Sequence, residues 1–271
     1  MYFLRLLLLF AFLIPSLTQA LDVRGYIGVS ALHFINDPLF DKQHQHNQQW
    51  SLLSEVEFYQ AWNNDQDSVL FTPYARIDQY DNERSHFDIR ELSWLHVEDN
   101  WEVRSGISKV FWGVNEFNHL VDIINQDDFA DDINGEEKLG QPMINLTLLK
   151  DWGTLDLFVL PGFRERTFPG ENGRLRFPIS VDTDHARYES SAKDKHVDFS
   201  VRWNHTFDDY DIAIYYFKGT NRDPYFIPDK DSNGELKLIP YYNQIDQVGM
   251  DFQATLEEWL WKLEVIQRND E

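Results

Sequence analysis

The chain alternates apolar and polar residues over most of its length. The clearest stretch is 196–207, whose apolar side includes Phe199 and Val201 and whose polar side includes Ser200 and Arg202. A period of two residues predicts a β-strand with one apolar face and one polar face.

Ten further segments show the same alternation. They are 23–34, 50–62, 68–80, 86–97, 101–111, 142–150, 153–162, 210–219, 247–256 and 259–265. The pattern therefore predicts an all-β protein with about eleven antiparallel strands.

The connections between these strands fall into two length classes on two rims. The short ones on one rim are 63–67, 98–100, 151–152, 208–209 and 257–258. The long ones, 35–49, 112–141, 163–195 and 220–243, are on the opposite rim, together with the short connection 81–85. This asymmetry is typical of outer-membrane barrels, which have short periplasmic turns and long outer loops, and a soluble β-sandwich has no reason to sort its loops in this way.

Aromatic residues stand beside the short turns. They are Trp62, Trp101, Trp152, Tyr210 and Trp259. Trp and Tyr prefer the membrane–water interface, although they could also pack the core of a sandwich. Together, the turns and the aromatic residues predict an antiparallel transmembrane up-and-down β-barrel.

The N-terminus reads as a secretion signal over residues 1–20. Arg5 supplies the positive region, an apolar run follows over 6–17, and small residues precede a cleavage site after Ala20. The apolar run is shorter than the ~20 residues that a membrane-spanning helix needs. The alternative is an anchor that is not cleaved. If the segment is a cleaved secretion signal, we expect residues 21–271 in the outer membrane of a Gram-negative bacterium.

The C-terminal end predicts an incomplete barrel. An odd number of strands leaves an open edge, which lipid does not tolerate, and residues 268–271 are charged. Outer-membrane barrels usually end on an aromatic residue that the barrel-assembly machinery reads. We therefore expect residues 21–271 to be the N-terminal part of a larger barrel, or the reading frame to be truncated.

Composition narrows the class of function. The formal net charge of −22 argues against nucleic-acid binding, and the absence of cysteine means that an exported chain has no disulfides. Charged residues alternate on the polar faces of the strands, which suits a watery lumen. The lumen candidates are Arg76, Asp78, Arg104, Asp198, Arg202, Asp251, Lys262 and Glu264.

These features favour a porin-like channel for the passive passage of small solutes, with outer-membrane lipid and lipopolysaccharide as its surroundings. Two alternatives stay open: an outer-membrane enzyme of the lipid-hydrolase type, and a secreted soluble β-rich protein that binds glycans. No Gly-x-Ser-x-Gly, His-Glu-x-x-His or glycine-rich phosphate motif occurs, so neither catalysis nor a cofactor is predicted.

The connection 112–141 is long, acidic and partly apolar. Its candidates for a pore constriction are Glu116, Asp122, Asp127 and Asp128. Phe117, Leu120, Val121 and Ile124 recur at helical spacing. We expect either a short helix folded into the lumen with its carboxylates facing the pore, or a solvated outer loop that packs on the rim.

The segment 163–177 carries four arginines around a Pro-Gly turn. Arg164, Arg166, Arg174 and Arg176 would share one face of a hairpin. If they face the acidic connection, they complete a charged constriction across a pore. The alternative is a hairpin that is solvated or that faces lipopolysaccharide.

Residues 86–265 resemble a porin-like family of Gram-negative outer-membrane proteins that is catalogued as a domain of unknown function. The resemblance rests on Gly106, on the run Lys109-Val110-Phe111-Trp112-Gly113, and on the Asp-x-x-Asn-x-x-Asp-like segment 122–127 with its neighbour Asp128. The later Pro161-Gly162-Phe163 and the segment 169–174 follow in the same order. The resemblance implies a barrel and assigns no substrate.

The segment 229–235 matches the first half of a calcium-binding loop. Asp229, Asp231 and Asn233 offer oxygen ligands, and Gly234 follows at the sixth position. Pro240 stands where a bidentate glutamate is needed. The same residues also favour a plain surface turn.

Overall fold

The computed structural model describes residues 21–269, and β-strands are its main regular structure. The strands are β1 (Asp22–His33), β2 (Gln48–Trp62), β3 (Asp67–Asp78), β4 (His86–Glu98), β5 (Trp101–Ser108), β6 (Gln141–Lys150), β7 (Gly153–Pro161), β8 (Arg187–Tyr188), β9 (Val197–Phe207), β10 (Tyr210–Thr220), β11 (Tyr225–Lys230), β12 (Leu236–Tyr242), β13 (Gln244–Leu256) and β14 (Trp259–Asn269). One short 3-10 helix, η1 (Lys193–Lys195), interrupts them. The predicted signal segment lies outside the described residues.

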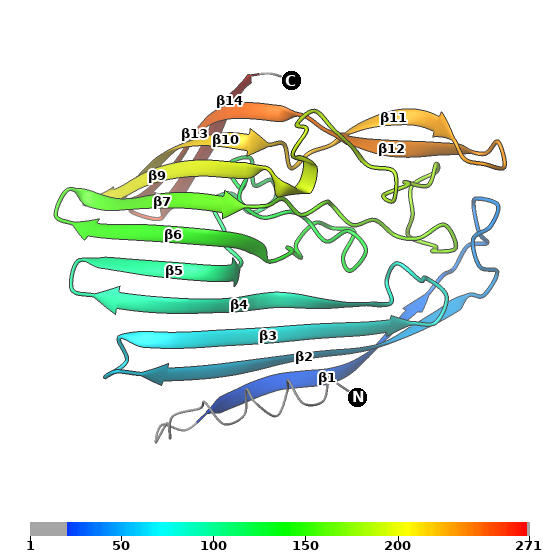
Figure 1. Ribbon diagram of the computed structural model, residues 1–271, viewed down its shortest axis with the longest axis horizontal. Coiled ribbons are helices and arrows are strands. Elements are labelled where there is room, and N and C mark those ends of the chain that lie inside the picture. Colours follow the sequence, from blue (N-terminus) through cyan, green and yellow to red (C-terminus); the bar gives the residue numbers. More distant parts are fainter. Residues whose placement is uncertain (1–20, 270–271) are drawn as a thin grey trace.

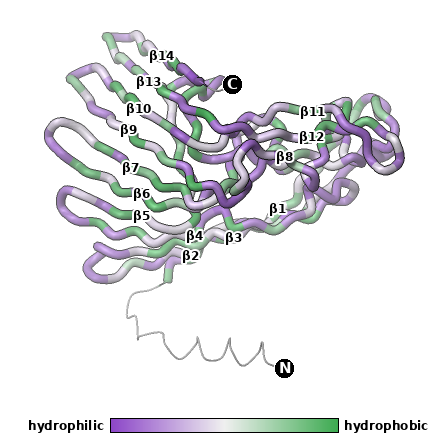
Figure 2. The backbone as a smooth tube through the Cα atoms, turned by 45° about the horizontal axis from the view of Figure 1, so that its top comes forward, coloured by the Kyte–Doolittle hydropathy of each residue, from purple (hydrophilic) through white to green (hydrophobic). Residues whose placement is uncertain are grey.

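Eleven strands form one antiparallel sheet in which neighbours along the chain are also neighbours in space (Figure 1). The order is β1-β2-β3-β4-β5-β6-β7-β9-β10-β13-β14. These are the eleven strands that the alternation predicts, and the all-β prediction is confirmed. The sheet is curved but open, because β1 and β14 form its two edges and do not pair with each other (Figure 2).

A second sheet of three strands was not predicted. It has the order β11-β12-β8, and β12 pairs with β8 in parallel through only two residue pairs. Pro228 and Pro240 interrupt the alternation in this region, so the sequence reads as one long connection. This small sheet lies beside the long connections at one end of the large sheet (Figure 1).

The two ends of the large sheet differ as the sequence predicts. The connections 63–66, 99–100, 151–152, 208–209 and 257–258 are tight turns, and those visible in Figure 1 lie at one end of the strands. Asp208 and Glu257 take positive φ angles of 50° and 55°, as the first residues of two-residue hairpin turns of the primed type do. The connections 34–47, 109–140, 162–196 and 221–243 lie at the other end.

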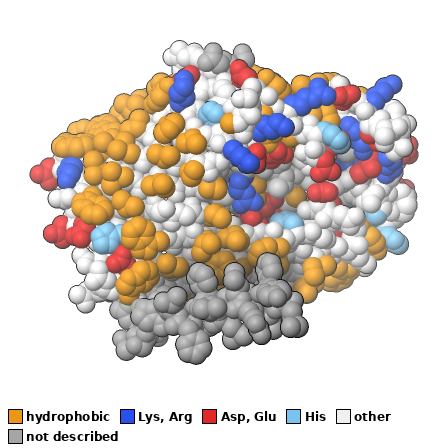
Figure 3. Space-filling view, viewed as in Figure 1, with side chains coloured by type: hydrophobic (Ala, Val, Ile, Leu, Met, Phe, Trp, Pro, Cys, Tyr) orange, Lys and Arg blue, Asp and Glu red, His pale blue; other side chains and the backbone are white. Residues whose placement is uncertain are grey.

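One face of the large sheet, here called the outer face, is apolar and open to the surroundings. Phe199 on β9, Val248 on β13 and Leu263 on β14 are each about half exposed. Apolar side chains spread over the strands in Figure 3, and charged side chains gather at the turn end and over the loops. Alternate colours along the strands in Figure 2 show the same period of two.

The connection 109–140, here called the inner loop, packs against the opposite face of the sheet. Its residues Trp112, Val121, Ile123 and Ile124 are buried with Phe158, Tyr215 and other side chains of that face. No α-helix forms in it, so the short helix, one of the two alternatives that the sequence leaves open, is not observed. No helix among residues 21–269 has the length and apolar character to cross a membrane.

Candidate functional site

The face covered by the inner loop, here called the inner face, carries the lumen candidates of the sheet. Residues that stand directly opposite each other in adjacent strands share a face. Arg104 stands opposite Asn145, Arg202 opposite Tyr215, and Asp251 opposite Glu264. By the same register, Arg76, Asp78, Asp198 and Lys262 also lie on this face.

The inner loop is fixed at its beginning by an aromatic contact. Trp112 is 3% exposed, and its ring centroid lies 5.0 Å from that of Tyr215 and 5.6 Å from that of Phe158. The guanidinium of Arg202 lies 5.4 Å from the same ring. This contact ties the loop to β7, β9 and β10 in the middle of the inner face.

A single carboxylate then shapes the next turn of the inner loop. Glu264 on β14 accepts hydrogen bonds from the backbone N–H groups of Val114 (2.8 Å), Asn115 (2.9 Å) and Val121 (3.3 Å). Gly113 has a φ of +123°, and a Cβ there would come within 2.8 Å of a Glu264 oxygen. The glycine therefore allows the chain to turn close to the carboxylate.

Farther along, a buried arginine–aspartate cluster clamps the inner loop to β3 and β4. Arg90 is 1% exposed, and it donates to Asp128 at 2.9 Å and to Asp131 at 3.3 Å. Arg76 also pairs with Asp131, and Arg84 donates to the carbonyl oxygens of Ala130 and Asp131. Asp128 and Asp131 thus bring the loop to strand guanidiniums, which satisfies charges that would be costly to bury alone.

The environment of Asp128 favours its ionised form. Burial alone would raise the pKa of this carboxyl. The contacts with His86 and Thr167 and the charge of Arg90 outweigh burial and hold the pKa well below its usual range. Thr167 donates its hydroxyl to Asp128 at 2.6 Å, so the segment that carries Arg164 and Arg166 is joined to the same cluster.

A second charged group joins the inner loop to the segment 162–168. Arg166 donates to Asp127 at 2.6 Å, and Lys138 lies 2.6 Å from Asp127 and 3.2 Å from Asp122. Burial raises the pKa of Asp122, while Lys138 opposes that shift. Arg164, in turn, donates to Asp88 on β4 at 2.9 Å. One alternative from the sequence has the arginines facing the acidic loop. Arg166 does contact that loop, whereas Arg164 pairs with β4.

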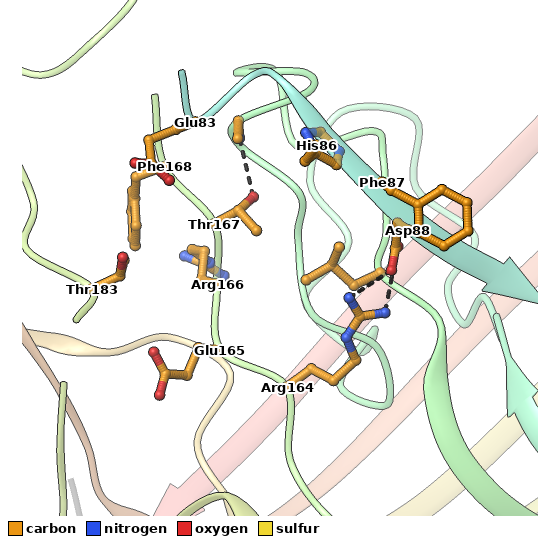
Figure 4. A pocket seen from close by; sticks show the side chains of 12 residues that line it. Glu83, His86, Phe87, Asp88, Arg164, Glu165, Arg166, Thr167, Phe168 and Thr183 are labelled. Atoms are coloured by element: carbon orange, nitrogen blue, oxygen red, sulfur yellow. Dashed lines mark hydrogen bonds and ion pairs between the residues drawn. The ribbon is translucent and has the colours of Figure 1, made fainter. Parts of the chain in front are cut away.

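A cavity of about 310 Å³ opens between the start of β4 and this segment (Figure 4). Glu83 and Glu165 lie on one side of it, and the Arg164–Asp88 pair lies on the other (Figure 4). Burial and the nearby Asp81 and Asp184 raise the pKa of Glu83. Burial raises the pKa of Glu165 as well, aided by nearby acids and opposed by a hydrogen bond from Tyr188. The carboxyl groups of Glu83 and Glu165 are therefore harder to ionise than free ones. A cationic group beside them would stabilise their ionised forms.

The other constriction candidates lie apart from this cavity. Glu116 pairs with Lys262 on the inner face. Arg174 donates to the carbonyl oxygen of Asn36, and Arg176 donates to those of Asp41 and Glu171. No strand forms over 163–177, so the expected hairpin with four arginines on one face is wrong. The first two arginines pair with carboxylates, and the last two donate to backbone carbonyls of the long connections 34–47 and 162–196.

Several lumen candidates are engaged in ion pairs on the inner face. Arg202 donates to Asp251 at 2.9 Å. Asp198 is fully buried and accepts from Arg222 at 2.6 Å. Asp78 accepts from Gln49 and Ser51 at 2.7 and 2.6 Å. The inner face is therefore a network of compensated charges and not a row of free ones.

The calcium candidates form an ordinary turn. The Asp231 carboxylate accepts from the backbone N–H groups of Asn233 and Glu235, and Asp229 pairs with Arg187. Within residues 21–269, no three acidic, histidine or cysteine side chains gather as a metal would require.

Sequence reasoning missed Arg84, Arg90, Asp131, Glu83 and Glu165. Asp88 and Arg90 alternate on the polar side of the strand predicted at 86–97, so the period of two could have found Arg90. Glu83 and Glu165 lie in connections, where the sequence carries no signal for proximity.

No protein-family model and no curated protein matches this chain. The resemblance of residues 86–265 to a porin-like family stays a prediction.

Proposed function

We propose that the chain forms the wall of a porin-like channel in the outer membrane of a Gram-negative bacterium. The apolar outer face supports this proposal, because exposed Phe199, Val248 and Leu263 suit contact with lipid. The polar inner face supports it as well, because compensated charges suit a watery lumen. In lipid, the edges β1 and β14 need pairing partners, so the proposal includes closure of the wall.

One observation carries the proposal: the inner loop folds onto the inner face, which bears the charged residues, while the apolar outer face stays exposed. A soluble sandwich buries the apolar faces of its sheets against each other. Here the apolar outer face stays exposed, and the covered face is the one that carries the ion pairs around an apolar cluster at Trp112. The loop that covers it is held by Arg90, Glu264 and Trp112. In a closed wall, such a loop narrows the passage and sets its charge.

The charges of the narrowed region favour cations. Glu83 and Glu165 line the cavity without an ion pair among the described residues, whereas Arg164 and Arg166 are both paired with aspartates. We therefore propose passive passage of small solutes with a preference for cationic ones.

The experiment is conductance of the full-length protein, extracted from outer membranes, in a planar lipid bilayer. We expect discrete steps and a reversal potential on the cation side in a salt gradient. Substituting both Glu83→Gln and Glu165→Gln moves the reversal potential toward zero. Glu257→Gln, in a tight turn at the opposite end of the sheet, is the matched control and leaves it in place. A protein that yields no steps, or that is recovered from the periplasm, contradicts the proposal.

A further inference from the structure

A groove of about 380 Å³ lies where β1 ends, β2 begins and β3 ends, on the side of the long connections. We call it the rim groove. Its lining residues are His33, His46, Asn47, Gln48, Trp50, Gln79 and Tyr80. It is separate from the cavity at the inner loop, and the proposed channel does not use it.

Backbone hydrogen bonds hold the groove in shape. The N–H of Gln79 donates to the carbonyl of Trp50 at 3.0 Å, and the N–H of Phe34 donates to that of Asn47 at 2.8 Å. His33 stands directly opposite Gln48 in the ladder of β1 and β2. The lining is therefore part of the sheet's end and not a free loop.

The lining is free of carboxylate, ammonium and guanidinium groups, although 26% of the chain's residues are charged. Its polar groups are amides and imidazoles, which both donate and accept hydrogen bonds. A ligand that is itself charged would find no opposite charge among these residues. An uncharged ligand with many hydroxyl groups would find donors and acceptors of both kinds.

An exposed indole gives the groove a flat surface, and the Tyr80 ring, stacked with two imidazoles, lines another part of it. Trp50 is 50% exposed. The ring centroid of Tyr80 lies 4.4 Å from that of His44 and 4.7 Å from that of His46, and both pairs are stacked. Aromatic faces carry partial negative charge, which attracts weakly positive C–H groups. A pyranose ring presents C–H groups on its faces and hydroxyls at its edge, and the groove offers the complement of each.

The groove also continues the outer face of the sheet. Trp50 stands opposite Ala31, and the next outward residues, Leu52 and Ile77, are 50% and 67% exposed. In the proposed membrane orientation, the groove lies above this apolar surface at the outer rim, where sugars of lipopolysaccharide are found. From these observations we infer that the rim groove binds an uncharged saccharide, either free in solution or carried by lipid.

Binding is tested by calorimetry on the full-length protein in detergent, with maltotriose, cellotriose, smooth lipopolysaccharide and deep-rough lipopolysaccharide as probes. We expect at least one neutral trisaccharide or the smooth lipopolysaccharide to bind. Trp50→Ala or Tyr80→Ala weakens that binding by about fivefold or more, the loss expected for one aromatic contact. Binding of a free trisaccharide assigns a solute sugar, and binding of smooth lipopolysaccharide alone assigns a lipid-linked one.

Trp152→Ala is the matched control, because Trp152 is 52% exposed and lies in a tight turn at the opposite rim. It leaves saccharide binding unchanged, even though it removes the same ring from the same kind of surface. Saturation-transfer NMR of the bound sugar on the unaltered protein adds a readout that needs no variant, with the strongest transfer to C–H protons of one sugar face. The inference is overturned if none of the four probes binds, if deep-rough lipopolysaccharide binds as well as the smooth form and neither trisaccharide binds, or if Trp50→Ala and Trp152→Ala have equal effects.

Discussion

Replacing Asp128 with asparagine should release the inner loop from the sheet. The substitution removes the negative charge that lies 2.9 Å from the Arg90 guanidinium, and Arg90 is 1% exposed. Removing one partner of a buried ion pair costs about 3–5 kcal/mol. Because Asp131 still lies 3.3 Å from Arg90, we expect the lower end, about 3 kcal/mol.

A cost of about 3 kcal/mol raises the population of the detached loop by about a hundredfold. Hydrogen exchange reports this population, because the amide of Leu139 donates to the carbonyl of Gln126 at 2.8 Å only while the loop is folded. In Asp128→Asn, we expect this amide to exchange about a hundredfold faster than in the unaltered protein.

Asp132→Asn is the control. It makes the same chemical change in the same loop, and the side chain of Asp132 accepts only from the backbone of Asn134 in the described contacts. The Asp128–Arg90 pair does not hold the inner loop if the Leu139 amide exchanges at its original rate in Asp128→Asn. The same conclusion follows if Asp132→Asn accelerates that exchange equally.

Three further outcomes follow from the same contacts. Trp112→Ala empties the centre of the buried aromatic group and should lower the free energy of unfolding by about 3–5 kcal/mol in a denaturant titration, whereas exposed Phe111→Ala changes it by less than about 0.5 kcal/mol. Gly113→Ala forces a Cβ toward the Glu264 carboxylate, so amide exchange over 114–121 should accelerate, and unchanged exchange there would refute the tight turn. Glu83 has a raised pKa in the folded protein, so its contribution to stability falls as pH rises from about 4.3 through that raised value. Glu83→Gln should therefore raise the thermal midpoint at pH 8 and leave it unchanged at pH 4; a midpoint that shifts equally at both would contradict this.

The large sheet follows from the sequence because its signal is local. Alternation of apolar and polar residues fixes which strands form, and the tight turns fix which strands are neighbours. The strand predicted at 196–207 is observed as Val197–Phe207, and the one predicted at 247–256 begins three residues earlier, at Gln244. Register follows as well, because a slip of one residue would exchange the two faces.

The path of the inner loop does not follow from the sequence, because distant residues determine it. The spacing of Phe117, Val121 and Ile124 predicts one apolar face of a helix. In the structure, Val121 and Ile124 are fully buried, and Phe117 is fully exposed. Glu264, more than a hundred residues away, takes the backbone N–H groups that a helix would have used internally. A tertiary contact of this kind overrides local periodicity.

The prediction of how the arginines pair failed for a related reason. Residue types show that Arg164, Arg166, Arg174 and Arg176 need acceptors, but they do not show which acceptors the fold brings near. The hairpin β11–β12 was missed because each of its strands contains a proline, and β8 was missed because it has only two residues and pairs with β12 across a long connection.

In the proposed wall, the outer face of the sheet lies against lipid and the inner face lies against water. The chain has no cysteine, so single cysteines can carry spin labels at Phe199, Ser200, Val201 and Arg202 on β9 without other changes. In native-like vesicles, we expect labels at 199 and 201 to collide mainly with oxygen, which concentrates in lipid, and labels at 200 and 202 to lack this preference. Equal access of a water-soluble nickel chelate to all four positions, with no period of two, would contradict it.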